Sequence, residues 1–200
     1  MVVASAASGK TTVLVARAQK LLDNGVDPTK IVVITFTNAA ADELLERLNK
    51  PQGIFIGTIH AYANYLLRSY GVDTSKVLDD EKFDLLFPLI KDHPNCIKTV
   101  EHLLLDEAQD STEEEFEFLL DMVQPQNYIL VGDYKQSIYR WRDAVPDYLI
   151  NLMHNPLITT YNLNENFRNG SSILQFAKSI IQQAGYDYID YSIPMRGVSG

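Results

Sequence analysis

The sequence contains very little cysteine and no long apolar segment, and each absence excludes a class of protein. Cys96 is the only cysteine among the 200 residues, so an intrachain disulfide cannot form. No run resembles a signal peptide, and none is long and apolar enough for a membrane span. We therefore expect a cytoplasmic protein that has no membrane partner.

Basic residues are also scarce. The chain has 17 Lys and Arg against 26 Asp and Glu, which gives a formal net charge of −9. A protein that coats nucleic acid through bulk electrostatics needs clustered Lys and Arg. The composition argues against that mode of binding and leaves local contacts with a nucleic acid open.

Short apolar runs rich in β-branched residues alternate with amphipathic helical patterns along the chain. This alternation predicts stacked βα units, and hence an α/β fold with a parallel sheet. The expected strands are Val2–Val3, Ile31–Thr35, Ile54–Ile56, Val100–Leu105, Tyr128–Val131 and Ile158–Tyr161. The expected helices are Thr12–Leu22, Ala39–Leu48, His60–Tyr70, Glu113–Met122, Pro146–Met153 and Ser171–Ala184, with an inserted helix at Asp79–Lys91.

A loop of small residues lies between the first expected strand and the first expected helix, and it has the pattern of a P-loop. In such a loop the backbone N–H groups bind phosphate, the lysine reaches the β- and γ-phosphates, and the following hydroxyl binds Mg²⁺. These roles fall to Lys10 and Thr11. The residues expected to contact the nucleotide are Ala4, Ser5, Ala6, Ala7, Ser8, Gly9, Lys10, Thr11 and Thr12. The alternative is an ordinary flexible turn, since Ala4 stands where the general motif has its first glycine.

Two acidic residues follow the apolar run Leu103–Leu105. At the end of a buried strand, Asp106 can bind Mg²⁺ and Glu107 can orient and deprotonate the attacking water. This pair turns a phosphate-binding loop into a hypothesis of nucleotide hydrolysis. The alternative is an acidic helix start, because carboxylates stabilise the N-terminus of a helix such as Glu113–Met122.

A third block, Val131–Ala144, combines a polar sensor with aromatic and basic residues. Gln136 could hydrogen-bond a γ-phosphate or its water, whereas Tyr139, Trp141 and Arg142 could stack on bases and hold them. The alternative is that both aromatic rings are core anchors beneath a loop.

Together with Thr35–Ala41, Gly57–His60 and Leu163–Arg168, these blocks resemble the ordered motif series of UvrD/Rep-type superfamily 1 DNA helicases. The wording of the motifs is most similar to the AddA/RecB helicase-nuclease branch. The resemblance implies a three-layer, RecA-like P-loop NTPase fold with helices on both faces of the sheet. It also implies ATP and Mg²⁺ as cofactors, single-stranded DNA as partner, and an ATP-dependent DNA helicase as the enzyme.

The resemblance assigns further residues by their positions in the motifs. Phe167 would stack on adenine, and Arg168 would approach the γ-phosphate as an arginine finger. The residues that would contact single-stranded DNA are Phe36, Thr37, Asn38, Thr58, His60, Tyr139, Trp141 and Arg142. Three alternatives stay open: Phe36 could be a core residue, His60 could be a polar residue near a helix cap, and Arg168 could pair with Glu165.

Departures from the family limit the expected activity. Ser5 and Ala7 replace glycines found in relatives, which predicts weakened nucleotide binding. We expect a first RecA-like domain over residues 1–184, with a reduced helical insertion within 61–99, and a linker over 185–200. A second RecA-like domain, in the same gene product or in trans, would be required for stepping along DNA, so the isolated chain would have little or no activity. The alternative functions are a non-catalytic nucleotide- or DNA-binding remnant and, less favoured, a small-molecule kinase.

Overall fold

The computed structural model of the chain describes residues 1–4, 7–133, 136, 146–163 and 165–183. Within them, six strands form one sheet in the order β3-β2-β4-β5-β1-β6, and every neighbouring pair is parallel. The strands are β1 (Val2–Ala4), β2 (Ile31–Ile34), β3 (Phe55–Gly57), β4 (His102–Leu105), β5 (Asn127–Gly132) and β6 (Tyr161–Leu163). The parallel α/β fold expected from the sequence is confirmed.

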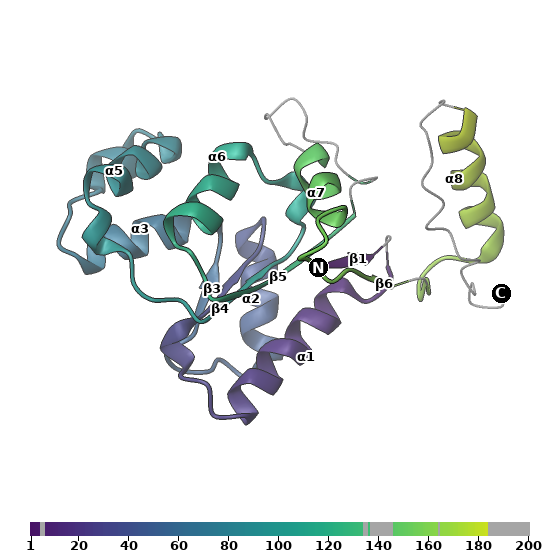
Figure 1. The fold of residues 1–200 in the computed structure, drawn as a ribbon, viewed down its shortest axis with the longest axis horizontal. Coiled ribbons are helices and arrows are strands. Elements are labelled where there is room, and N and C mark those ends of the chain that lie inside the picture. The colour runs from purple at the N-terminus through teal and green to yellow at the C-terminus, as the bar shows by residue number, and fades with distance from the viewer. Residues whose placement is uncertain (5–6, 134–135, 137–145, 164, 184–200) are drawn as a thin grey trace.

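Helices cover both faces of this sheet (Figure 1). One face carries α1 (Lys10–Asp23) and α2 (Asn38–Arg47). The other carries α3 (Ile59–Ser69), α5 (Leu86–Asp92), α6 (Glu113–Phe116) and α7 (Pro146–Met153). The remaining elements are α4 (Ser75–Asp79), α8 (Ser171–Gln183), the short 3-10 helices η1 (Pro28–Lys30), η2 (Phe83–Leu85), η3 (Pro94–Cys96) and η4 (Ala108–Asp110), and the π-helix η5 (Glu117–Met122).

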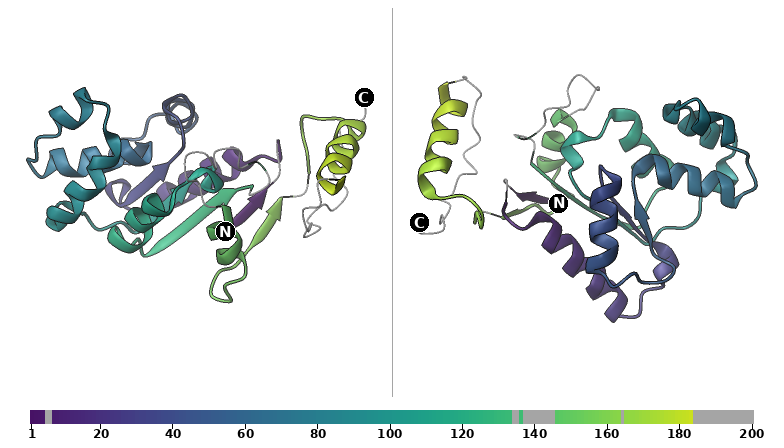
Figure 2. Two further views of the ribbon diagram at one scale, coloured as in Figure 1. Left: turned by 90° about the horizontal axis from the view of Figure 1, so that it is seen from above. Right: turned by 180° about the vertical axis from the view of Figure 1, so that it is seen from behind.

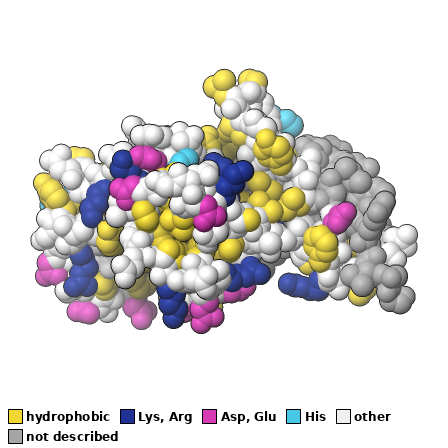
Figure 3. All heavy atoms as spheres, turned by 90° about the horizontal axis from the view of Figure 1, so that it is seen from below, with side chains coloured by type: hydrophobic (Ala, Val, Ile, Leu, Met, Phe, Trp, Pro, Cys, Tyr) yellow, Lys and Arg dark blue, Asp and Glu magenta, His cyan; other side chains and the backbone are white. Residues whose placement is uncertain are grey.

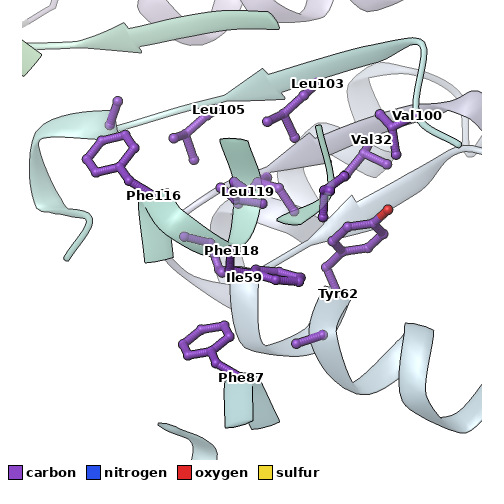
Figure 4. Packing of buried hydrophobic residues seen from close by; sticks show 14 of the residues in the cluster. Val32, Ile59, Tyr62, Phe87, Val100, Leu103, Leu105, Phe116, Phe118 and Leu119 are labelled. Carbon is purple, nitrogen blue, oxygen red and sulfur yellow. The ribbon is translucent and has the colours of Figure 1, made fainter. Parts of the chain in front are cut away.

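Alternation along the strands builds two apolar cores, one on each face. In β2, Val32 and Ile34 belong to the core beneath α3, α5 and α6, whereas Ile31 and Val33 belong to the core beneath α1 and α2. This is the period of two that a strand buried on both faces requires. Figure 4 shows the first core, where aromatic rings from α3, α5, α6 and η5 lie on the side of the sheet to which the leucines of β4 point.

The face with α1 and α2 shows how charge is distributed (Figure 3). Lys and Arg side chains are interspersed with Asp and Glu around a central group of apolar side chains. Charges of both signs are therefore mixed on the described part of this face.

The prediction of one inserted helix at Asp79–Lys91 is wrong, because this region contains the end of α4, then η2 and then α5. Helix α4 ends in a Schellman motif, with Glu81 at a positive φ of 55° and the Lys82 N–H donating to the carbonyl of Val77. Pro88 then lies in the first turn of α5, where no intrahelical N–H is needed. Apolar periodicity continues across the break, so the pattern alone could not locate it.

Two other boundaries also differ from expectation. Strand β6 begins at Tyr161, three residues later than Ile158, because Asn155–Ile158 forms a turn. The helix expected over Glu113–Met122 changes from α to π geometry at Glu117. The other strands and helices agree with the prediction to within two residues at most of their ends.

Helix α8 stands apart from the sheet and its covering helices in every view (Figures 1 and 2). Ile173, Phe176 and Ile180 recur at helical spacing along it, and their exposed fractions are 58%, 68% and 51%. No helix in the described part of the chain is long and apolar enough to cross a bilayer. The linker expected at 185–200 lies outside the described residues.

Candidate active site

The expected P-loop connects β1 to α1 at the carboxyl edge of the sheet. Gly9 caps the helix with a φ of 88°, and Ala7 also adopts a positive φ, of 57°. A residue with a Cβ is strained in this region of backbone space, so Ala7 carries the strain that the sequence predicted for a replaced glycine. Ser5 and Ala6 lie outside the described residues. Ala4 does not face the site, because it ends β1 and is buried in the core beneath α1.

The structure brings the loop together with the twin acids. The Lys10 ammonium lies 2.9 Å from Oε2 of Glu107, and the Thr11 hydroxyl donates to Oδ2 of Asp106 at 3.5 Å. The two motifs are 95 residues apart in sequence, and they meet because β1 and β4 are parallel strands separated only by β5. The alternative was that these acids merely start a helix. Glu107 is the N-cap residue of η4, but its side chain caps nothing there and pairs with Lys10 instead, while α6 begins only at Glu113.

Burial makes the carboxyl group of Asp106 unusual. Desolvation, followed by the neighbouring charge of Glu107, raises the pKa of Asp106 to about 6. The same two causes raise the pKa of Asp110 to about 6. Asp110 Oδ1 is buried and has no hydrogen-bond partner within the described residues. The site therefore holds more carboxylate than its own cations neutralise.

Glu107 itself adopts a left-handed backbone, with a φ of 48°. Its N–H donates to Oδ1 of Asp106 at 3.0 Å. A non-glycine residue keeps such a strained backbone only where the surrounding structure compensates for the cost, as often happens at functional sites. Here the strained backbone accompanies a Glu107 side chain that points toward Lys10.

These residues line a cleft of about 830 Å³, large enough for a nucleotide. The residues that line it are Ala7, Ser8, Gly9, Lys10, Thr11, Thr12, Val13, Glu43, Arg47, Glu107, Gln136, Phe167 and Arg168. Predicted members from four separate motifs therefore face one cavity. No group of three or more His, Cys, Asp or Glu suited to a metal occurs in the parts of the chain that the structure describes.

The turn after β6 places its two predicted residues on this cleft. The Phe167 N–H donates to the Ala7 carbonyl at 2.9 Å, and the Phe167 side chain is 65% exposed. Asn166 is buried, and its Oδ1 accepts from the N–H groups of Arg168 and Asn169 at 2.9 and 2.7 Å. Among the described residues, no ion pair joins Arg168 to Glu165.

Sequence reasoning missed several of these residues. Glu43 and Arg47 reach the cleft from α2, where they form an i,i+4 pair at 3.7 Å. Asn166, within Leu163–Arg168, and Gln109, two residues after Glu107, are buried polar residues, and neither was given a role. The signal that could have found them is an amide side chain within an otherwise apolar or acidic block.

The predicted DNA-contacting residues follow β2 and β3, at the same carboxyl edge. Thr37 and Thr58 cap α2 and α3, since their hydroxyls accept from the N–H groups three residues later. Asn38 is exposed, and Phe36 is half-buried and belongs to neither apolar core. The core alternative for Phe36 is therefore not supported.

His60 is engaged with the helical insertion. Its Nε2 lies 3.3 Å from Oδ1 of Asp84, and its ring packs 5.2 Å from that of Phe87. It occupies the second position of α3, two residues after the capping Thr58, so it is also a polar residue near a helix cap, as the alternative had it. Tyr139, Trp141 and Arg142 lie outside the described residues.

Comparison with known proteins adds to this geometry. The family model described as the UvrD/REP helicase N-terminal domain matches residues 1–93 and 89–156. The Gabija protein GajB of Bacillus cereus is 29% identical over 84% of this chain and 43% of its own length. ATP-dependent DNA helicase PcrA of Leuconostoc citreum is 26% identical over 90% of this chain and 37% of its own length.

A solved structure, that of Pif1 helicase from Candida albicans, covers 90% of this chain and 39% of its own chain, with a TM-score of 0.47 and 16% identity. The chain thus spans less than half the length of the relatives named here. The PcrA comparison runs over 274 positions, which exceeds this chain, so that relative carries segments with no counterpart among these 200 residues. The match of the family model, over more than half of the residues, shows that this chain belongs to the UvrD/REP helicase N-terminal domain family.

Proposed function

We propose that this chain is the ATP-binding and ATP-hydrolysing motor domain of a DNA helicase that acts on single-stranded DNA. The observation that carries the proposal is that Lys10, Thr11 and Glu107 line one cleft, with 2.9 Å between the Lys10 and Glu107 side chains, and that the buried Asp106 carboxylate lies against Thr11. Relatives named as ATP-dependent DNA helicases support the choice of ATP and DNA.

Mg²⁺ fits the residues present. Magnesium prefers hard oxygen ligands and is held by one or two carboxylates together with substrate phosphates. The Thr11 hydroxyl and the buried Asp106 carboxylate are such ligands, and a cation would offset the desolvation that raises the pKa of Asp106. When bound, the metal would neutralise charge that develops on the phosphates.

The chain's own residues would then divide the work of hydrolysis. Lys10 would leave Glu107 for the β- and γ-phosphates, which frees the Glu107 carboxylate to take a proton from the attacking water. Gln136 would orient that water or the γ-phosphate. Arg168, held beside the P-loop by the turn at Asn166, would stabilise the transferring phosphoryl group.

Single-stranded DNA would lie across the ends of β2 and β3. Phe36, Thr37, Asn38, Thr58 and His60 would contact it there, with Tyr139, Trp141 and Arg142 from the third block. Stacking on aromatic faces is tolerant of sequence, as a translocating motor requires. Because the chain is acidic, this binding would be weak and local.

A second RecA-like domain would complete the motor. The apolar stripe Ile173, Phe176 and Ile180 of α8 is too exposed to belong to the sheet body, and an amphipathic helix buries such a stripe against another element. We infer that α8 packs in the second domain. In this proposal the boundary lies between β6 and α8, ahead of the predicted boundary after residue 184.

One specific observation favours the alternative, a non-catalytic nucleotide-binding remnant. Ala7 is strained at the P-loop, and this strain would weaken phosphate binding by the loop. A binder, however, has no chemical need for Glu107 or Arg168 on the cleft. Membership of the AddA/RecB branch and a cytoplasmic location stay predictions from the sequence.

The experiment that tests the proposal is calorimetry with Mg²⁺ and ATP, followed by an ATPase assay with and without single-stranded DNA. The assay uses the chain alone and the chain fused to a second RecA-like domain of a relative. We expect weak ATP binding by the chain, abolished in Lys10→Ala, and DNA-stimulated turnover in the fusion. Absence of binding at millimolar ATP would reject a motor, and binding without turnover in the fusion would select the remnant.

A further inference from the structure

Gln109 is a buried amide at the centre of the acidic strand end. It is the middle residue of η4, directly after β4, and its exposed fraction is 2%. Its Nε2 donates to Oε2 of Glu107 and to Oδ2 of Asp110, both at 3.0 Å, and its Oε1 accepts from the N–H of Asp133 at 2.9 Å. Both N–H hydrogens of the amide are thus used, and the neighbouring backbone N–H fixes which way the amide points.

The neighbouring strand leaves this amide no room to move. A Cβ at Gly132, the last residue of β5, would lie 2.7 Å from Oε1 of Gln109 and 3.3 Å from the backbone nitrogen of Ala108. Only glycine permits so close an approach of the two strand ends. Gln109 is therefore held between β4 and β5 by packing as well as by hydrogen bonds.

The same amide connects to the predicted phosphate sensor. Asp133 Oδ2 accepts from Nε2 of Gln136 at 2.6 Å, and the Gln136 N–H donates to the Asp133 carbonyl at 2.8 Å. A continuous series of hydrogen bonds thus runs from Glu107 through Gln109 and Asp133 to Gln136. It joins residues of two motifs that meet only in the folded chain.

The two oxygens of the Glu107 carboxylate are used differently. Oε2 accepts from both Lys10 and Gln109, whereas Oε1 accepts no hydrogen bond from the described residues. When a phosphate attracts Lys10 away, Gln109 is left as the group that holds Oε2. Because Glu107 lines the cleft, its other oxygen, Oε1, is then the one to which a water in the cleft can donate.

We propose that Gln109 is the positioning residue that aims the Glu107 carboxylate at the attacking water and sets it in register with Gln136. The inference rests on the proposed function and deepens it, because it names the group that orients the base once Lys10 binds phosphate. Loss of this orientation lowers the rate of hydrolysis and leaves nucleotide binding intact, since Gln109 does not line the cleft.

The test compares Gln109→Met and Gln109→Glu with Gln126→Met, a matched control at an exposed residue directly before β5. In the form of the protein that hydrolyses ATP, we expect both Gln109 variants to lower kcat about 10²-fold with unchanged ATP affinity, and the control to match the native rate. Gln109→Glu keeps the acceptor for Asp133 but lacks the donors for Glu107. Native kcat in Gln109→Glu would overturn the proposal.

A double-mutant cycle separates positioning from a merely structural role. Combined with Glu107→Ala, Gln109→Met should lower kcat no further than Glu107→Ala does alone, whereas an independent structural role would lower it by the same factor again. Melting of the nucleotide-free variants gives a second cycle, in which we expect a coupling of about 2 °C between the two positions. Additive melting shifts would overturn the proposal, whether or not any form of the protein hydrolyses ATP. A failure of every form to hydrolyse ATP would reject the proposed function, and it would be seen separately.

Discussion

The two halves of the sheet's carboxyl edge differ in how their predicted residues are used. At the ends of β4, β5, β1 and β6, polar side chains contact one another across motifs, as Lys10 does with Glu107 and Thr11 with Asp106. At the ends of β2 and β3, the polar residues mostly serve their own segments, since Thr37 and Thr58 cap the helices that follow. In the first half, the polar contacts form only when distant segments meet in the fold. In the second half, the polar side chains find their hydrogen-bond partners within their own segment.

This difference predicts how each half responds to substitution. Side chains that converge from separate strands hold charge in a desolvated cleft, so changing them alters catalysis or the electrostatic free energy of the fold. Side chains that cap helices contribute to stability whether or not a ligand is present. The following four expectations test that division, in order of decreasing effect.

The largest effect is expected for Glu107→Gln, which removes the base and keeps its volume. Turnover should fall by about 10²- to 10⁴-fold while ATP still binds, because the phosphate-binding loop is untouched. Steady-state kinetics beside calorimetry checks this, with Glu114→Gln on an exposed helix surface as the control. An unchanged rate of hydrolysis would show that Glu107 is not the catalytic base.

Asp106→Asn should stabilise the metal-free protein at neutral pH. In the native protein the pKa of the Asp106 carboxyl group is about 6 in the folded state and 3.8 in the unfolded state. The folded state therefore binds more protons between these pH values, and the stability of the native protein falls as pH rises through that window. Above pH 6 the full penalty is present, and its removal is worth about 1–3 kcal/mol. Urea unfolding at pH 4 and 7.5 measures it, and a variant no more stable than native at pH 7.5 would contradict it. Asp121→Asn, on an exposed residue, should show no such gain.

Thr58→Ala tests the locally satisfied half. Loss of the hydroxyl leaves the Ala61 N–H without its cap, which should lower stability by about 0.5–2 kcal/mol and leave ATP affinity unchanged. Thermal melting and calorimetry measure the two quantities, and Thr58→Ser should retain the native stability. A loss of ATP affinity in Thr58→Ala would break the division between the halves.

The smallest effect is expected for Ala7→Gly. Glycine adopts the φ of 57° without strain, and the gain should be about 0.5–1 kcal/mol after the greater entropy of the unfolded glycine is counted. We expect the gain in melting temperature and in ATP affinity. Ala39→Gly, inside the first turn of α2, should instead destabilise, and a matching loss at Ala7 would show that its backbone is not strained.

Much of the catalytic half could be predicted from the sequence. Lys10, Thr11, Asp106 and Glu107 follow apolar runs that read as buried strands, and parallel strands bring their carboxyl ends to one edge. The order of the motifs was therefore enough to bring these four residues together. Their separation of nearly one hundred positions did not matter.

The remaining residues could not be predicted because their roles depend on which strands are neighbours. Gln109 matters only because β5 lies beside β4, and Arg47 matters only because the end of α2 reaches the cleft. The end of α4 at Glu81 could not be predicted for a local reason: the left-handed backbone of this glutamate interrupts the helix, while the apolar pattern continues on both sides. Patterns report which face is apolar, and they do not report which polar groups meet.

The single backbone bond from Phe167 to the Ala7 carbonyl has a mechanical consequence. It joins the start of the connection to α8 directly to the phosphate-binding loop, at the strained residue Ala7. A force that a second domain exerted on α8 would be transmitted to the phosphate-binding loop through this hydrogen bond. In the proposed motor, load on α8 would therefore act on the loop that holds the phosphates.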